Sequence, residues 1–282
     1  MSRGIKKWSE EAISRLQREG RGKGRGPTYT PWIYITDLYS QGRTHEMYSH
    51  KTGRQHQLLS DGERDAFIML EWAQDVVDIR EQYPLPRDIT LELALEAGIR
   101  HPYYPGTHVP VVMTLDFLVT KVVNGQEVPE AFSVKVHDDL NDAAVVERLE
   151  LERAICQATG MPYRLLVKER MPQVKLKNLR WIRDAQLDSN ATEAFPGFYE
   201  EHKARMVQDM ATRRFDGSLV DYCAEYDRRY SVEPGTGMRV ARMLLSSRAI
   251  TMDLNNPQPQ VAHMDSFTLT ALPGRLRSVG GI

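Results

Sequence analysis

The chain has 282 residues, enough to bury a full hydrophobic core and to form two domains. Hydrophobic residues make up 41% and charged residues 27%, which are ordinary globular values that argue against a disordered chain. The formal net charge of -1 does not by itself indicate a nucleic-acid partner. No apolar run approaches the roughly 18–20 residues that cross a bilayer. The N-terminus lacks a secretion signal and the two cysteines form no disulfide framework, so we expect a cytoplasmic protein.

Basic residues concentrate near the N-terminus, between residues 3 and 25. They are Arg3, Lys6, Lys7, Arg15, Arg18, Arg21, Lys23 and Arg25, against Glu10, Glu11 and Glu19. Such an arm can neutralise DNA phosphates, but a plain solvated terminus explains the charges equally well. Residues 8–19 have the pattern of a short amphipathic helix, and residues 20–27 alternate glycine with basic residues. That run has no preceding strand and no closing Gly-Lys-Ser/Thr, so it is a linker or a DNA contact rather than a P-loop.

The next elements predict strands followed by a helix. Strands are expected over residues 32–35 and 45–49, and the pair Thr52-Gly53 predicts a turn before a segment at 54–59. Ser60 and Glu63 have the spacing of a capping box, which predicts a helix from Ser60 to about residue 74. A short β-branched strand is expected over 76–79, ended by Pro84 and the proline after it.

The middle of the chain predicts a hairpin. Residues 109–122 form an almost unbroken apolar run, typical of a strand buried on both faces. The turn pair Asn124-Gly125 leads to a second strand over about 131–136, then a helix over 141–159 and a strand over 163–167. Beyond residue 170 we expect helices at 193–215, 218–230 and 238–249 and a strand at 249–254. This pattern suits a winged-helix module, and a small helical bundle nearly as well.

Asp116 is the most informative residue, because it stands alone in the apolar run. An isolated buried carboxylate costs several kcal/mol unless it is paired or binds a metal. Hairpin geometry places Asp116 opposite about Ser133, with Lys135 on the same face as Ser133. A structural ion pair between Asp116 and Lys135 is one interpretation. The other is a metal-dependent nuclease site, in which the carboxylate holds the metal and the lysine orients the attacking water.

Two glutamates are further candidates. Glu63 is explained by the capping box alone, but it shares a helical stripe with Phe67 and Leu70, so its side chain is expected to point toward the core or a cleft. Glu152 lies on the apolar side of its helix, close to Cys156 in helical spacing, and is a candidate for a supporting role around the site.

The sequence resembles the TnsA family, the endonuclease subunits of heteromeric transposases in Tn seven-type transposons. The resemblance covers about residues 15–185. It rests on Gly20-Arg21-Gly22-Lys23-Gly24, Pro31-Trp32, Tyr48-Ser49-His50-Lys51-Thr52-Gly53-Arg54, Leu58-Leu59-Ser60-Asp61, Leu70-Glu71-Trp72, Asp78-Ile79-Arg80-Glu81-Gln82-Tyr83-Pro84-Leu85, Asp116-Phe117-Leu118-Val119 and Leu149-Glu150-Leu151-Glu152-Arg153. Long runs in one order are far more specific than any single motif.

The resemblance implies an α/β fold in three parts: a basic arm over 1–27, a restriction-endonuclease-like catalytic domain with a central mixed sheet over 28–172, and a mainly helical winged-helix-like domain over 173–282. It implies cleavage of the 5′, non-transferred strand of double-stranded DNA at transposon ends. The implied partners are an integrase-type transposase subunit and an AAA+ ATPase regulator.

The same resemblance assigns roles to individual residues. The catalytic acids fall on Glu63 and Asp116, the lysine on Lys135, and the carbonyl of Val134 would complete the shell of one or two Mg²⁺ ions, for which Mn²⁺ can substitute. Ser133 departs from the pattern, because many nucleases of this fold carry Gln, Glu or Asp there; a short, uncharged hydroxyl is a poor direct ligand.

DNA-backbone contacts are expected from the basic residues Arg21, Lys23, Arg25, Lys51 and Arg54. Two alternatives to the transposase endonuclease remain open from the sequence. One is a catalytically weak or inactive adaptor between transposase and ATPase, which the serine at position 133 keeps open. The other is a standalone restriction or repair nuclease, which would cut DNA without partner subunits.

Overall fold

The computed structural model describes residues 8–37, 43–186 and 193–270 and divides into two compact units, Met1–Met171 and Pro172–Ile282. Each unit is described by itself below. The basic residues Arg3, Lys6 and Lys7, expected to be part of a DNA-binding arm, lie outside the described residues. No helix in the described part of the chain is long and apolar enough to cross a membrane.

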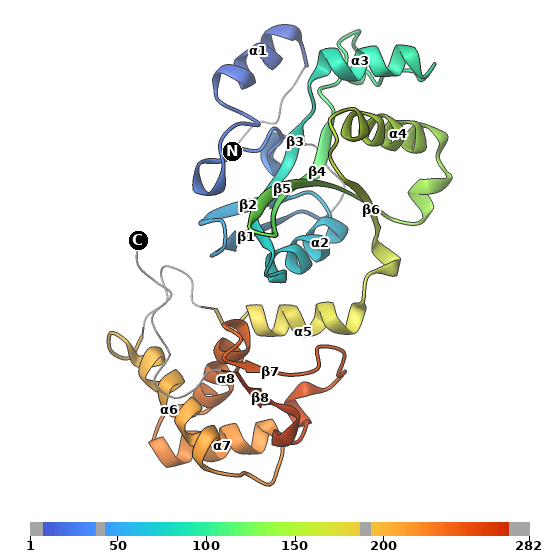
Figure 1. The fold of residues 1–282 in the computed structure, drawn as a ribbon. Helices are drawn as coiled ribbons and strands as arrows, with labels where there is room; N and C mark the ends of the chain where they lie inside the picture. The colour runs from blue at the N-terminus through green and yellow to red at the C-terminus, as the bar shows by residue number, and fades with distance from the viewer. Residues whose placement is uncertain (1–7, 38–42, 187–192, 271–282) are drawn as a thin grey trace. The chain divides into compact units, whose positions relative to one another are not determined.

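A four-stranded mixed sheet forms the centre of the N-terminal unit, as the sequence predicts (Figure 1). Its strands, in spatial order, are β3 (Val76–Pro84), β4 (Thr114–Val123), β5 (Gln126–Lys135) and β6 (Tyr163–Val167). The first three are antiparallel, and β6 runs parallel to β5. A separate antiparallel pair consists of β1 (His45–Ser49) and β2 (Arg54–Leu58).

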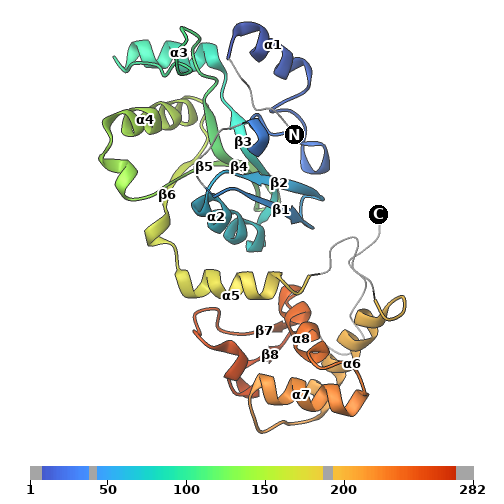
Figure 2. The ribbon, with the colours of Figure 1, turned by 180° about the vertical axis from the view of Figure 1, so that it is seen from behind.

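Helices cover both sides of this sheet. In Figures 1 and 2, α2 (Asp61–Trp72) and α4 (Ala143–Ala158) lie on opposite sides of strands β5 and β6. The helix α3 (Arg87–Glu96) packs against α4. Their shared core with the sheet consists of buried apolar side chains: Leu85, Ala94, Met113, Leu115, Ala131, Leu151, Ile155 and Cys156. Burial of this apolar surface fixes both helices on the sheet that carries the candidate site.

The first helix, α1 (Glu10–Arg18), confirms the amphipathic helix predicted over residues 8–19. Ser9 caps its N-terminus, and Ile13 and Leu16 are buried against Trp32. The glycine-rich run that follows is held closely: at Gly22, with φ +74°, an added Cβ would lie 2.2 Å from Cγ of Pro84. The described part of the basic arm therefore packs on the N-terminal unit.

Several predicted boundaries are wrong. The strand expected over 32–35 is absent: residues 32–33 form a bend, and a 3-10 turn begins at Ile35 and ends at Asp37. The strand expected from residue 109 begins at Thr114, because the preceding segment instead bonds to a neighbouring loop, with Val111 N–H donating to Pro102. The strand expected over 76–79 continues to Pro84, and the helix α3 was not predicted.

The C-terminal unit is mainly helical, with α5 (Gln173–Arg183), α6 (Phe198–Thr212), α7 (Leu219–Tyr230) and α8 (Thr236–Ser246). A short antiparallel pair joins β7 (Ile250–Thr251) and β8 (Thr268–Leu269). The helix α8 contacts the other three and buries Val240, Ala241 and Leu244 completely. The last three helices are confirmed within a few residues of their predicted bounds, whereas α5 was not predicted.

Candidate active site

Asp116 and Lys135 meet across the β4–β5 hairpin, in the register that the sequence predicts. The pair Phe117–Phe132 is in direct register, so Asp116 lies across from Ser133. The Asp116 Oδ2 atom accepts the main-chain N–H of Val134 at 2.6 Å and the Lys135 ammonium at 3.2 Å. Its side chain is 15% exposed, so the carboxylate sits at an opening of the unit rather than deep in the core.

Lys135 is the last residue of β5, and its ammonium is held among acidic groups. It donates to the Val134 carbonyl at 2.9 Å as well as to Asp116. Burial alone would lower the pKa of Lys135, but the charges of Asp116, Glu152 and Glu63 outweigh it and raise the pKa above its usual value. Lys135 is therefore a fixed cation that offsets negative charge at this point of the sheet.

Glu63 is brought to the same place by the first turn of α2. The Ser60 hydroxyl accepts the Glu63 N–H at 3.0 Å, as in the predicted cap. Its carboxylate is nevertheless buried, 6% exposed, and accepts the Leu59 N–H at 2.9 Å. Burial and the nearby charge of Asp116 raise the pKa of Glu63 to about 8. A carboxylate in this position favours a cation placed between it and Asp116.

Ser133 and Glu152 form a second pair beside the first. The buried Ser133 hydroxyl donates to Glu152 at 2.5 Å, and the Tyr163 hydroxyl donates to the same oxygen at 3.1 Å. Burial and the charge of Asp116 raise the pKa of Glu152 to about 7. The helix α4 thus supplies a carboxylate behind the position where the strand carries serine.

Two residues of the site were not predicted, Gln82 and Thr114. The Gln82 amide donates to Glu63 at 3.2 Å, and its carbonyl oxygen accepts the Thr114 hydroxyl at 3.2 Å. Gln82 falls beyond the short strand that the sequence predicts, so it was not placed on the sheet. No local signal marks it, because the apolar pattern of the strand stops at Ile79 and Arg80, Glu81 and Gln82 follow.

The donor set at this place fits a divalent cation of the Mg²⁺ type, because carboxylate and carbonyl oxygens are its preferred ligands. Both hydrogen bonds given to Asp116 by the described residues fall on Oδ2, which leaves Oδ1 for another ligand. Among the described residues, no group of three or more His, Cys, Asp or Glu side chains is arranged to hold a metal. An ion here would therefore take two carboxylates, a carbonyl and water.

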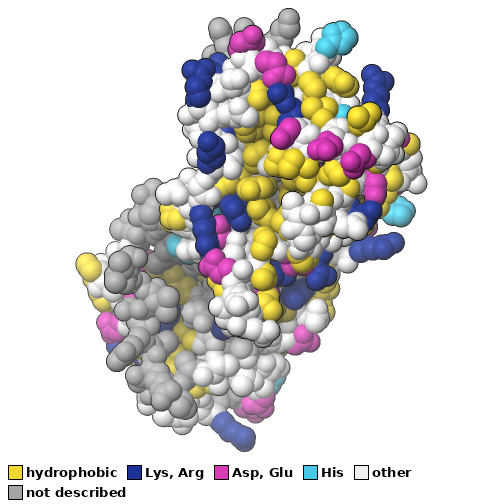
Figure 3. Space-filling view, turned by 45° about the horizontal axis from the view of Figure 1, so that its top comes forward, with side chains coloured by type: hydrophobic (Ala, Val, Ile, Leu, Met, Phe, Trp, Pro, Cys, Tyr) yellow, Lys and Arg dark blue, Asp and Glu magenta, His cyan; other side chains and the backbone are white. Residues whose placement is uncertain are grey.

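The expected DNA contacts of the glycine-rich run differ in their exposure. Arg21 is largely buried and donates to Asp37 at 2.5 Å. Arg25 is half exposed and bonds Glu127 at 2.6 Å, whereas Lys23 is exposed. Figure 3 shows basic side chains scattered among acidic and apolar ones on the visible face of the N-terminal unit, with no continuous basic surface. Of these three residues, Lys23 and Arg25 have exposed side chains.

The other two expected contacts lie elsewhere. The Lys51 ammonium donates to the Ala73 carbonyl at 2.5 Å. The Arg54 side chain is 8% exposed and bonds the buried Glu81 carboxylate at 2.5 Å and 2.8 Å. The expectation that Arg54 tracks the DNA backbone is corrected on this ground, because its guanidinium is already used inside the unit.

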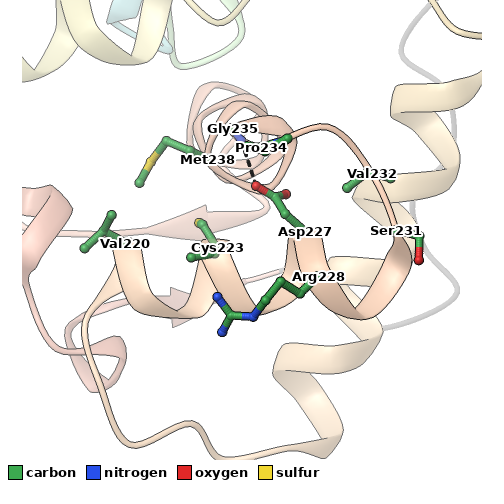
Figure 4. A pocket seen from close by; sticks show the side chains of 10 residues that line it. Val220, Cys223, Asp227, Arg228, Ser231, Val232, Pro234, Gly235 and Met238 are labelled. Atoms are coloured by element: carbon green, nitrogen blue, oxygen red, sulfur yellow. Dashed lines mark hydrogen bonds between the residues drawn. The ribbon is translucent and has the colours of Figure 1, made fainter.

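The C-terminal unit carries a cavity of about 470 Å³ between α7 and α8 (Figure 4). Its one acidic lining residue among those described, Asp227, accepts the N–H groups of Gly235 at 2.7 Å and Gly237 at 2.6 Å and so caps α8. Burial raises the pKa of the Cys223 thiol to about 12, which makes it a poor nucleophile. The one carboxylate of this lining is therefore used in capping α8.

Comparisons with known proteins identify the family of the chain. The family description "TnsA-like endonuclease N terminal" matches residues 73–168, and "TnsA endonuclease C terminal" matches residues 171–254. The chain is 34% identical over 254 residues to the transposon Tn7 transposition protein TnsA of Escherichia coli, covering 90% of each chain. The first match includes Asp116 and Lys135, and the longer alignment takes in most of both units. The chain belongs to the TnsA family of transposon endonucleases.

Proposed function

We propose that the chain is a metal-dependent DNA endonuclease that hydrolyses the 5′, non-transferred strand at transposon ends, as one subunit of a cut-and-paste transposase. The observation that carries the proposal is the meeting of Asp116 with the Lys135 ammonium at 3.2 Å, beside the buried Glu63. An acidic pair with an adjacent lysine suits phosphodiester hydrolysis, in which a cation, a water and a developing negative charge must be held together.

Mg²⁺ is the proposed cofactor, as one or two ions, with Mn²⁺ able to replace it. Glu63, Asp116 and the carbonyl of Val134 would hold it. When bound, the metal polarises the scissile phosphate and lowers the pKa of a water. The Val134 N–H and Lys135 fix the Asp116 carboxylate from one side, so that its remaining oxygen keeps one direction.

Lys135 has two proposed tasks at this site. Its ammonium is a permanent cation beside Asp116, so it can orient the attacking water and offset charge that develops on the phosphate. Glu152 and Ser133 would act behind it: the short hydrogen bond between them keeps the Glu152 carboxylate close to the lysine. Neither of the two is proposed to touch the scissile phosphate.

The proposed architecture is a restriction-endonuclease-like catalytic domain over residues 28–172, preceded by a basic arm and followed by a winged-helix-like domain over 173–282. The mixed sheet and the helices on both its sides support the first, and four helices with a short strand pair support the second. The proposed partners are double-stranded DNA at transposon ends, an integrase-type transposase subunit and an AAA+ ATPase regulator. Lys23 and Arg25 would contact the DNA backbone.

A non-catalytic adaptor is the second candidate, and one observation favours it. Position 133 carries a serine rather than an acidic residue. Its hydroxyl already donates to Glu152, so it is not free to bind a metal. An adaptor would bridge transposase and ATPase with a nuclease fold that has lost its metal. We rank it second because Glu63 and Asp116 still offer two carboxyl groups that a cation could share, with Lys135 beside them.

The proposal predicts cleavage that depends on both partner and metal. We expect the full chain, mixed with its partner transposase and DNA carrying a transposon end, to nick only the 5′ strand in Mg²⁺. Separate 5′ and 3′ end labels on denaturing gels would measure each strand. Removal of metal by a chelator should stop the nick, and Mn²⁺ should restore it. Cutting by the chain without the transposase would instead indicate a standalone nuclease, and no cutting in any mixture would indicate an adaptor.

A further inference from the structure

Gln82 occupies an unusual place in the sheet. The flanking pairs Glu81–Phe117 and Tyr83–Leu115 place it across from Asp116, in the middle of the site. Its φ of +47° lies in the left-handed region, although it is a glutamine inside a strand. The other described non-glycine residues with positive φ all lie in turns or at helix ends: Asn124, Ser231 and Arg248. Strain of this kind persists only where the surroundings fix it, and it clusters at functional sites.

The side chain of Gln82 is fixed at both ends. It is 3% exposed, and its carbonyl oxygen accepts the Thr114 hydroxyl at 3.2 Å. This bond sets the direction of the amide, so the NH₂ group faces Glu63 and donates to Oε2 at 3.2 Å. The main-chain N–H of Leu59 donates to the same oxygen at 2.9 Å. Two donors on one oxygen fix the rotation of the Glu63 carboxylate.

We propose that Gln82 is a positioning residue, which holds the Glu63 carboxylate in the one orientation that lets it share a divalent cation with Asp116. The inference rests on the proposed metal-dependent function. The helix α2 brings Glu63 to the sheet, where the Ser60 hydroxyl donates to Oε1 at 3.3 Å and the Leu59 N–H and the Gln82 amide share Oε2. Of these three donors, Gln82 is the one on a strand of the four-stranded sheet, so it ties the carboxylate to the strands that carry Asp116. The strained turn of backbone at Gln82 is what aims an uncharged donor at that carboxylate without adding a competing charge.

The test measures metal binding rather than cleavage. Full-length protein would be titrated with Mn²⁺, and the free ion measured by its electron paramagnetic resonance signal. In Gln82→Met, which keeps the length and removes the amide, we expect the dissociation constant to rise roughly 10- to 100-fold, as for other residues that orient metal ligands. The half-saturating Mg²⁺ concentration for cleavage should rise similarly, with much of the maximal rate recovered at high Mg²⁺.

Gln57→Met is the matched control. Gln57 is also a buried glutamine of the N-terminal unit, 7% exposed, whose amide donates to a different carboxylate, Glu46, at 3.0 Å. We expect it to bind Mn²⁺ like the wild type. Gln82→Gly guards against a folding defect, because glycine adopts the positive φ without strain; we expect it to fold and still to bind Mn²⁺ weakly.

The outcomes separate this inference from the function on which it rests. If Asp116→Ala loses Mn²⁺ but Gln82→Met and Gln82→Gly bind it like the wild type, the positioning role is wrong and the metal site stands. If the wild type binds no Mn²⁺, or Asp116→Ala binds it equally well, the proposed metal site is wrong and the role of Gln82 falls with it. Weakened binding in Gln57→Met as well would show a general packing effect and overturn the positioning role.

Discussion

Asp116→Asn is expected to reduce strand cleavage at least roughly a thousandfold, because a metal supplies several kcal/mol of transition-state stabilisation and each 1.4 kcal/mol is tenfold in rate. Asparagine keeps the size of the side chain and can still accept the Val134 N–H, which aspartate accepts at 2.6 Å. It removes the charge that a cation needs. The measurement is the rate of 5′-strand nicking on end-labelled DNA, in the presence of the partner transposase and saturating Mg²⁺.

The matched control for this prediction is Asp78→Asn. Asp78 is a buried aspartate on the neighbouring strand β3 that likewise accepts a main-chain N–H, from Ile79 at 3.0 Å. It lies outside the group around Asp116, so we expect the variant to cleave like the wild type once its folding is verified. Assembly with transposase and DNA, followed by gel shift, should be unchanged in Asp116→Asn. Nicking at the wild-type rate by that variant would contradict the assignment.

The hairpin that carries the site could be predicted from sequence because its signals are local. A lone carboxylate in an apolar run, a two-residue turn and the alternation of side chains along a strand together set the register that brings Asp116 beside Lys135. Glu63 could be placed on the correct face of its helix by spacing, but its approach to the sheet depends on how α2 packs. Only the resemblance to a family supplied that step.

Gln82 illustrates what local patterns do not contain. Its role depends on a left-handed backbone inside a strand, and glutamine has no particular preference for that conformation. The strain is imposed by tertiary contacts, among them the bond from Trp32 N–H to the Gln82 carbonyl at 3.2 Å. Likewise α5 was not predicted, although Leu176, Leu179 and Ile182 have helical spacing and are all buried.

Arg54 was misplaced for a related reason. An arginine near other basic residues favours a surface position, and nothing local indicates the buried Glu81 that it meets. The structure also places the His56 ring against Glu81 at 2.8 Å, with Thr52 on its other nitrogen at 2.7 Å. Glu81 of this network directly precedes Gln82 on β3. The network therefore helps to stabilise the strand from which Gln82 reaches Glu63.

Arg54→Met is expected to lower the free energy of unfolding by about 3–5 kcal/mol, the usual cost of leaving a buried charge without its partner. Burial alone would raise the pKa of Glu81, but the bonds from Arg54 and His56 outweigh it and lower the pKa to about 2. Urea unfolding followed by tryptophan fluorescence would measure the change, since three of the four tryptophans, Trp8, Trp32 and Trp72, belong to the N-terminal unit.

The pH dependence of this loss has a definite sign. The Glu81 pKa is depressed from 4.5 in the folded chain, so its ion pair contributes stability above about pH 4.5 and loses it as the pH falls toward 2. Without Arg54, burial raises that pKa again and Glu81 takes up a proton more readily. The difference between wild type and Arg54→Met should therefore be largest near neutral pH and shrink in acid.

Arg80→Met provides the comparison for this stability prediction. Arg80 lies on β3 and is 18% exposed, with its guanidinium 3.5 Å from the Asp78 carboxylate, so water can compensate for part of its loss. We expect it to cost less than Arg54→Met, because the buried Asp78 carboxylate keeps the N–H groups of Gly26 and Ile79 and the Arg25 side chain 3.8 Å away. Equal losses in the two variants, or a loss in Arg54→Met that stays constant with pH, would show that the size of the side chain rather than the buried charge of Glu81 sets the cost. The contrast between them then isolates the close ion pair of Arg54 with Glu81, because both replacements remove an arginine of the N-terminal unit and leave a side chain of similar length.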